Sequence, residues 1–248
     1  MTSFSYQLYS SRNFPPLEDT LKMLRRTGYT EVESYGAMYS DPAALKAALE
    51  AADMKLPSGH LSLDAAMNEL DGSIAMLNML GLSSVYIPYL QPEQRPTNAQ
   101  GWTEMGQQLE KLSGTFNAAG LHFGYHNHDF EFLPTDDGSI PMRLLLDAAP
   151  SIGWEADLAW VVRGQNDPLD WIAEYGVRIS AVHIKDIAPS GECADEDGWA
   201  DVGHGTMNWQ ELMTALKPKP VRHFIMEHDN PRDDARFAAR SLQTLQSF

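Results

Sequence analysis

The feature of this sequence that most limits its fold is a repeated unit, a short apolar strand followed by an amphipathic segment. Eight stretches have the pattern of strands: Phe4–Tyr9, Glu31–Tyr35, Lys55–His60, Ser84–Ile87, Leu121–His126, Ile152–Asp157, Ala181–Lys185 and His223–Glu227. Apolar residues at helical spacing occur between them, as in Leu17–Arg26, Pro42–Ala52, Leu63–Leu80 and Thr103–Ala119. Glycine follows several of these segments, which is typical of a helix end, at Gly28, Gly81, Gly120 and Gly176.

This alternation predicts the fold class. Strands that alternate with helices form parallel sheets through right-handed crossovers, and eight such units close into a barrel. The chain has 248 residues, close to the roughly 250 that a (β/α)₈ TIM barrel uses. We therefore expect one TIM barrel domain over residues 1–248. An open dinucleotide-binding sheet is the alternative, but no Gly-x-Gly-x-x-Gly turn follows the first strand.

The net charge of the chain limits the classes of molecule that it is expected to bind. A net charge of −16 disfavours binding to nucleic acid and, more weakly, to a strongly phosphorylated substrate, whereas a neutral sugar suits it. No apolar run approaches the roughly 20 residues of a membrane span. Residues 1–7 lack the features of a signal peptide, and Cys193 is the one cysteine. We expect a cytoplasmic protein that contacts no membrane. A homodimer is compatible with the sequence, which marks no interface.

Polar residues at the strand ends predict where the chemistry lies. In a TIM barrel the active site forms at the C-terminal ends of the strands. The residues expected there are Gln7, Glu33, His60, Tyr86, His126, Asp157, His183 and Glu227. Each of these residues, taken alone, has a simple alternative to a functional role: it can be a structural group held by hydrogen bonds. Six acids and histidines among eight positions favour function, because buried polar groups cost free energy unless they are paired.

Four of these residues predict a metal site. His126, Asp157, His183 and Glu227 offer two imidazoles and two carboxylates, a donor set suited to Mn²⁺, Co²⁺, Zn²⁺, Fe²⁺ or Mg²⁺. They come from strands five to eight, so they share one half of the rim. Lys185 alternates to the same side as His183 and is expected to bind a substrate oxygen. The alternative is a buried salt-bridge network without a metal.

The segment from His126 to Phe132 is the densest polar cluster of the chain. His128 and Glu131 are expected in a loop over the site, where Glu131 has three possible roles: catalytic carboxylate, metal ligand or clamp of the loop. Gln7, Glu33 and His60 face the opposite half of the rim, where hydrogen bonds to sugar hydroxyls are expected. Five tryptophans are candidates for stacking on a sugar, although packing is the more frequent role: Trp102, Trp154, Trp160, Trp171 and Trp199.

Motifs in this order and spacing resemble one family. They are Tyr6-Gln7-Leu8-Tyr9-Ser10, Gly28-Tyr29-Thr30-Glu31-Val32-Glu33, Ser58-Gly59-His60, Gly124-Tyr125-His126-Asn127-His128-Asp129-Phe130-Glu131-Phe132, Val182-His183-Ile184-Lys185-Asp186, Val202-Gly203-His204-Gly205 with Trp209, and Ile225-Met226-Glu227-His228-Asp229. Together they make the chain similar to the sugar phosphate isomerase/epimerase family, the xylose isomerase-like barrels that include inosose dehydratases. The resemblance covers nearly the whole chain.

The resemblance implies a ligand set and also a departure from it. The family's epimerases hold a metal by Glu, Asp, His and Glu, and the two glutamates move the proton. Asp157, His183 and Glu227 match the last three, whereas His126 stands where the first glutamate is expected. That departure puts a two-glutamate mechanism in doubt and is similar to the dehydratase branch. Relatives often have histidine three residues after the aspartate, where this chain has Trp160, so part of the substrate pocket differs.

The resulting hypothesis is a metal-dependent isomerase or epimerase of a small keto-sugar or polyol. One divalent ion would bind the substrate carbonyl, and a base would remove the neighbouring proton to form an enediolate. Glu227 and Glu131 are the carboxylate candidates for the base, His126 and His128 the imidazole candidates, and Lys185 is expected to act with them. Dehydration or elimination by a lyase on the same site is the alternative. A nuclease and a non-catalytic sugar-binding barrel are the rivals from other classes.

Overall fold

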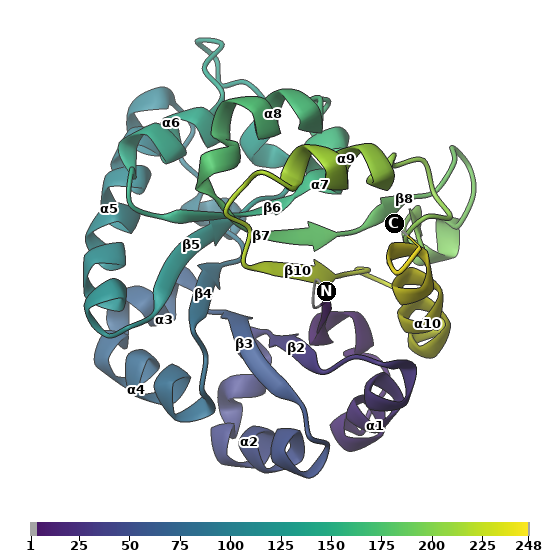
Figure 1. Cartoon of the computed structure of the whole chain (residues 1–248). Helices are drawn as coiled ribbons and strands as arrows, with labels where there is room; N and C mark the ends of the chain where they lie inside the picture. The colour runs from purple at the N-terminus through teal and green to yellow at the C-terminus, as the bar shows by residue number, and fades with distance from the viewer. Residues whose placement is uncertain (1–3, 248) are drawn as a thin grey trace.

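Eight parallel strands close into a barrel in the computed structural model, which describes residues 4–247 (Figure 1). The strands are β1 (Phe4–Gln7), β2 (Glu31–Ser34), β3 (Lys55–His60), β4 (Ser84–Ile87), β5 (His122–His126), β6 (Gly153–Asp157), β7 (Ile179–Ile184) and β10 (His223–Met226). Their order around the barrel follows the chain, and β10 closes on β1. The expected single-domain TIM barrel is therefore confirmed.

Helices surround the barrel on its outside (Figure 1). They are α1 (Leu17–Thr27), α2 (Pro42–Ala51), α3 (Leu63–Asn68), α4 (Leu70–Leu80), α5 (Ala99–Ala118), α6 (Pro141–Ala148), α7 (Leu158–Arg163), α8 (Pro168–Tyr175), α9 (Trp209–Leu216) and α10 (Asp234–Leu245). Short 3₁₀ helices are η1 (Leu8–Ser11), η2 (Gly36–Ser40), η3 (Pro92–Gln94), η4 (Phe130–Phe132), η5 (Gly176–Arg178) and η6 (Ala194–Glu196). Among the described residues no helix is long and apolar enough to cross a membrane.

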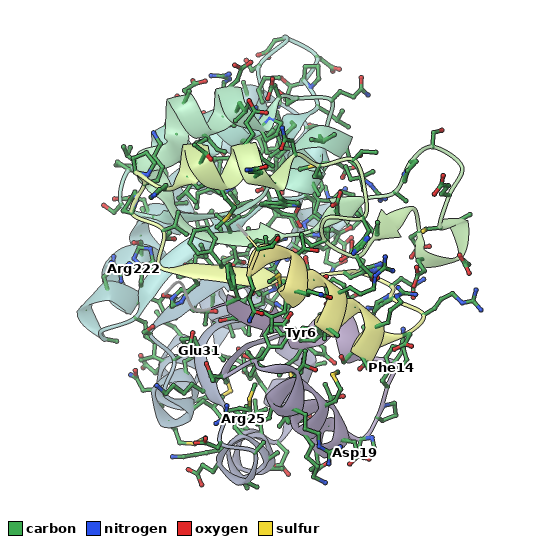
Figure 2. The ribbon with its side chains drawn as sticks, turned by 45° about the vertical axis from the view of Figure 1, so that its right-hand side comes forward. Tyr6, Phe14, Asp19, Arg25, Glu31 and Arg222 are labelled. Atoms are coloured by element: carbon green, nitrogen blue, oxygen red, sulfur yellow. The ribbon has the colours of Figure 1, made fainter. Side chains whose placement is uncertain are left out.

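The main hydrophobic core lies between the strands and the helices. Tyr6 of β1 points outward into it and packs edge-on against Tyr29, with ring centroids 5.5 Å apart. Figure 2 shows Asp19 and Arg25 on the outer helix α1, whose polar face is exposed. Gly28 ends α1 in the left-handed region, with φ of 118°, and its N–H donates to the carbonyl of Leu24. The alternation of strand side chains thus sends one set to the core and leaves the other inside the barrel.

Most strand bounds differ from the predicted ones by one or two residues, and three differences have a clear local cause. The first strand ends at Gln7 because its side chain accepts a hydrogen bond from the N–H of Tyr9 and begins η1. The segment predicted as one helix over Leu63–Leu80 is two helices, separated where Glu69 leaves helical geometry with φ of −130°. Helix α5 begins earlier than predicted because Asn98 caps it, accepting a hydrogen bond from the N–H of Gly101.

An excursion of the chain follows β7 at the C-terminal rim. It runs over residues 186–207, here called the β8–β9 loop, and contains the antiparallel strands β8 (Asp186–Ile187) and β9 (Trp199–Ala200). The carboxylate of Asp186 accepts hydrogen bonds from the backbone N–H groups of Ile187, Gly203, Gly205 and Met207. A Cβ atom on Gly205 would lie 2.2 Å from that carboxylate, so the close approach requires glycine there. The loop is therefore fixed at its base beside β7.

Candidate metal centre at the C-terminal rim

The strand register places the predicted site residues at two depths inside the barrel. His126 pairs with Glu155, whereas Asp157 pairs with His183 nearer the strand ends. Glu227 follows β10, and its N–H donates to the carbonyl of Ile184. The side chains of the four predicted metal ligands are buried, and their donor atoms lie within 4.8 Å of one another. The structure therefore brings His126, Asp157, His183 and Glu227 together.

Asp157 is held at the end of β6 from two sides. The side chain of Asn127 accepts from its N–H at 3.0 Å and donates to its carbonyl at 3.0 Å. Oδ1 of Asp157 then caps α7 by accepting from the N–H groups of Ala159 and Trp160. Oδ2 makes no hydrogen bond among the described residues and points to Lys185. One oxygen of Asp157 thus has a structural role and the other faces the cavity.

His183 joins the two depths. Its Nδ1 donates to Oε2 of Glu227 at 2.9 Å, and its Nε2 donates to Oε1 of Glu33 at 2.7 Å. Burial alone would lower the pKa of His183, but Glu227 and Glu155 raise it well above its usual value. Burial likewise would raise the pKa of Glu33, whereas His60 and His183 hold it at about 2. A metal ion would have to replace a proton on this ring.

Lys185 occupies the centre of a carboxylate cage. Its Nζ lies 2.9 Å from Glu227, 3.1 Å from Asp157 and 2.9 Å from Asp229. Burial lowers the pKa of Lys185, but the three carboxylates outweigh burial and raise it above its usual value. The indole of Trp199 lies 4.6 Å from the ammonium group on the side of the β8–β9 loop. Lys185 is therefore a fixed positive charge beside the predicted rim site.

Glu155 lies in this cluster although it is not at a strand end and was not predicted there. It lies on β6 two residues before Asp157, so it points to the same side of the strand. His60 donates to its Oε2 at 2.7 Å. Burial raises the pKa of Glu155 to about 7, with the charge of Glu33 in the same direction. The sequence could have predicted this position, because the alternation of side chains in Gly153–Asp157 puts Glu155 on the same face as Asp157, inside the barrel.

The remaining predicted residues lie around this cluster. Gln7 donates to Glu33 at 2.9 Å, and His60 lies within 3.4 Å of the same carboxylate. His128 stands half-buried above His126, with ring centroids 5.1 Å apart. Burial lowers the pKa of both imidazoles, that of His128 to about 3, so both are neutral at pH 7. Trp160 is half-buried next to His128, whereas the other tryptophans considered for stacking are buried.

Glu131 lies on a different side of the loop from the metal candidates. Its Oε1 accepts from the hydroxyl of Tyr125 at 2.7 Å and its Oε2 from the N–H of His128 at 2.8 Å. Tyr125 alternates with His126 on β5 and packs in the outer core. Of the three roles left open for Glu131, these contacts are those of a clamp on the loop.

The clamp predicts a pH dependence of stability. Burial raises the pKa of Glu131 to about 7, although the hydrogen bonds from Tyr125 and His128 oppose it. The folded state therefore holds this proton more tightly than the unfolded chain. Its stabilising effect is complete below about pH 4.5 and is lost as the pH rises through 7. We expect Glu131→Gln to flatten this decline, by at most about 1.4 kcal/mol per pH unit.

Denaturant unfolding across that pH range is the measurement. Glu192→Gln, at an exposed position of the β8–β9 loop, is the matched control and should leave the decline unchanged. Parallel curves for wild type and Glu131→Gln would show that Glu131 does not carry this proton.

The residues form two groups that fit a divalent cation. One is His126, Asp157, His183 and Glu227, and the other is His60, His126, Glu155 and His183. Glu155 Oε1 and Glu33 Oε2 are buried and make no hydrogen bond among the described residues. Asp157 Oδ2 and His126 Nδ1 make none either, although they lie 3.1 Å from Lys185 Nζ and 3.2 Å from Glu155 Oε2. Buried polar atoms without partners are costly, and nitrogen with carboxylate donors suits Zn²⁺, Co²⁺ or Mn²⁺. The residues present therefore fit a metal ion.

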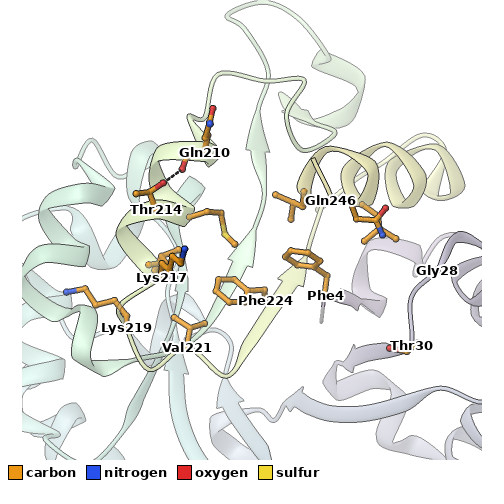
Figure 3. A pocket seen from close by; sticks show the side chains of 14 residues that line it. Phe4, Gly28, Thr30, Gln210, Thr214, Lys217, Lys219, Val221, Phe224 and Gln246 are labelled. Carbon is orange, nitrogen blue, oxygen red and sulfur yellow. Dashed lines mark hydrogen bonds between the residues drawn. The ribbon is translucent and has the colours of Figure 1, made fainter. Parts of the chain in front are cut away.

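A large pocket lies elsewhere on the molecule (Figure 3). Its volume is about 920 Å³, and Phe4, Thr30, Val221 and Phe224 line it together with side chains of α9 and α10. These residues begin the strands, so the pocket opens at the N-terminal end of the barrel. None of the predicted site residues lines this pocket. The chemistry predicted for this chain belongs to the opposite end.

Comparison with known proteins agrees with the fold and the motifs. Residues 21–247 match the family of xylose isomerase-like TIM barrels, and the chain belongs to this family. This confirms the resemblance inferred from the sequence. The rhizopine catabolism protein MocC of Rhizobium meliloti is 25% identical over 190 residues, 69% of this chain. The chain spans 58% of the length of that curated relative.

Solved structures share the whole barrel at low identity. A sugar phosphate isomerase/epimerase from Parabacteroides distasonis ATCC 8503 is 22% identical with a TM-score of 0.80, covering 99% of this chain and 93% of that one. The probable 3-DHS dehydratase AsbF from Bacillus anthracis is 13% identical with a TM-score of 0.77, covering 99% of each chain. The IOLI protein with a binding zinc atom is 15% identical with a TM-score of 0.76, covering 99% of this chain and 97% of that one. At these identities the likeness shows the fold alone.

Proposed function

We propose that this protein is a metal-dependent sugar isomerase or epimerase acting on a small keto-sugar or polyol. The observation that carries the proposal is the rim group of His126, Asp157, His183 and Glu227 beside the ammonium group of Lys185. The solved isomerase/epimerase with the same barrel and the relative that contains zinc support it. The acidic chain favours an uncharged substrate.

Each residue of the group has a chemical task. A divalent ion held by the four side chains would supply Lewis-acid polarisation of a substrate carbonyl, which acidifies the neighbouring C–H bond. Burial raises the pKa of Glu227, but Lys185 and His183 outweigh it and hold the pKa well below its usual value. Glu227 is therefore ionised at neutral pH and can accept a proton. Lys185 is placed to hold a substrate oxygen that gains negative charge.

Return of the proton decides the product. His126 is neutral at pH 7, and its ring centroid lies 4.5 Å from that of His183. It offers an imidazole at a position separate from Glu227. Proton return to the neighbouring carbon gives isomerisation, and proton return to the opposite face of the same carbon gives epimerisation. Trp160 and His128 supply the half-buried surface on which the substrate would rest.

Dehydration by a lyase is the second candidate. His126 in place of the glutamate favours it, because it removes one of the two carboxylates of a two-base epimerisation. The dehydratase with the same barrel lends further support. After loss of the proton to Glu227, the hydroxyl one carbon further on would leave as water with that proton, and the ammonium group of Lys185 would donate a hydrogen bond to the enolate oxygen. Both candidates share the first step.

The test follows this shared step. The protein, loaded with Mn²⁺ or Co²⁺, is incubated in deuterium oxide with fructose, xylulose and an inosose in turn. We expect deuterium to enter one substrate at the carbon next to the carbonyl, detected by proton NMR, and EDTA to stop it. A changed sugar supports the isomerase or epimerase, whereas an unsaturated product supports the lyase.

Asp157→Asn is the variant that links this exchange to the rim group. It keeps the hydrogen bonds of Oδ1 that cap α7 and removes the negative charge facing Lys185. We expect exchange to be lost while the thermal unfolding stays cooperative. Exchange that persists in EDTA, or in Asp157→Asn, would refute metal-dependent proton transfer at the rim.

A further inference from the structure

A second cluster of imidazoles and carboxylates lies deeper in the barrel than the rim group. Glu155 is its centre: its Oε2 lies 2.7 Å from His60 Nε2, 3.2 Å from His126 Nδ1 and 3.5 Å from His183 Nε2. Glu33 adds a second carboxylate, 2.7 Å from His183 and 3.4 Å from His60. Three nitrogens and two oxygens from strands β2, β3, β5, β6 and β7 thus meet at one point.

The donor atoms of His60, His126, Glu155 and His183 lie within 4.8 Å of one another, close enough to share one ion. Ligand atoms bound to Zn²⁺ at about 2.0–2.1 Å in a tetrahedron lie roughly 3.4 Å apart. The contacts around Glu155 run from 2.7 to 3.5 Å. Oε1 of Glu155, Oε2 of Glu33 and Nδ1 of His126 make no hydrogen bond among the described residues, although they are buried. Hydrogen bonds within the protein therefore pair one oxygen of each carboxylate and leave the other without a partner.

Charge separates this deeper cluster from the rim. At the rim, the ammonium group of Lys185 already contacts Asp157 and Glu227. Glu33 and Glu155 contact imidazoles instead, together with the neutral amide of Gln7 in the case of Glu33. The imidazoles compensate these two buried carboxylates only while they are protonated, whereas a divalent ion would carry a permanent double positive charge. Three imidazoles with one carboxylate also favour the softer ions Zn²⁺ and Co²⁺ over Mg²⁺.

We propose that His60, His126, Glu155 and His183 form a second cation position that takes Zn²⁺ or Co²⁺. His183 faces the rim with Nδ1 and the deeper position with Nε2. Since a neutral imidazole offers one free nitrogen, His183 serves one position at a time. The two positions are alternatives for a single ion, and the proposal extends the metal requirement of the proposed function to a residue pair, His60 and Glu155, outside the rim group.

Cobalt binding distinguishes the two positions without an activity assay. Metal-free protein is titrated with Co²⁺, followed by visible absorption, and bound Co²⁺ is counted by elemental analysis after dialysis. Asp157→Asn disables the rim position, and Glu155→Gln and His60→Gln each disable the deeper one. Thermal unfolding of every metal-free variant verifies the fold. Because Glu155→Gln and His60→Gln test the deeper position independently, the experiment still decides if one of them does not fold.

We expect Asp157→Asn to retain about one Co²⁺ per chain. Adding Glu155→Gln or His60→Gln to it should weaken Co²⁺ binding by at least about tenfold and remove the absorption band. Asp157→Asn without Co²⁺, or with an affinity that neither deep substitution changes, would overturn the proposal. That result leaves the proposed function intact, because deuterium exchange in the wild type tests the rim independently.

Discussion

Lys185→Met is expected to lower the free energy of unfolding of the metal-free protein by about 3–5 kcal/mol. Methionine nearly preserves the length of the side chain, so the loss comes from the charge. The substitution leaves Asp157, Glu227 and Asp229 without the ammonium group that contacts all three. A buried ion pair that loses one partner is more destabilising than one replaced as a whole, because an uncompensated charge remains.

Denaturant unfolding of EDTA-treated protein measures this effect. Lys22→Met is the matched control, because Lys22 is exposed and, within residues 4–247, pairs only with Asp19 on α1. It should change stability by no more than about 0.5 kcal/mol. Saturating Co²⁺ should restore part of the stability of Lys185→Met, since the ion supplies the missing positive charge. Equal stability of the two metal-free variants would show that the carboxylates around Lys185 are not charged together.

Glu227→Gln is expected to slow deuterium exchange by about 10²–10⁴-fold. The amide keeps the size of the side chain but cannot accept the substrate proton, and it weakens the donor set of the rim group. The initial rate of exchange under saturating metal is the measurement. Glu50→Gln, the same change at an exposed position of α2, should leave the rate unchanged. A rate above half that of the wild type would exclude Glu227 as the base.

The strand ends predict much of this site because two regularities of the chain act together. The repeat of strand and helix determines that the strands run parallel, so their C-terminal ends meet. His126, Asp157, His183 and Glu227 are therefore brought together by topology alone, before any contact is known. The outward alternation of Tyr6 and the inward alternation of Gln7 follow from the same period.

Depth and loop direction are what the sequence pattern leaves undetermined. Glu155 has the right parity, but its distance below the rim depends on the register between β5 and β6. Asp229 lies beyond the strand end, and the three-carboxylate cage of Lys185 depends on how the chain turns there. Glu131 turns away to Tyr125 because the loop closes on itself through the N–H of His128. Such tertiary contacts leave no periodic pattern in the sequence.

The attachment of the β8–β9 loop bears on which changes this segment can accept. Asp186 ties the loop at its base through four backbone N–H groups, and Glu196 and Asp201 join the rest of residues 188–202 to Arg236 of α10 by ion pairs. Changes in length or sequence there alter what stands over Lys185, as Trp199 does here, without displacing Lys185 itself. We therefore expect substitutions in this segment to change what can lie against the ammonium group of Lys185 while the four residues of the rim group keep their positions.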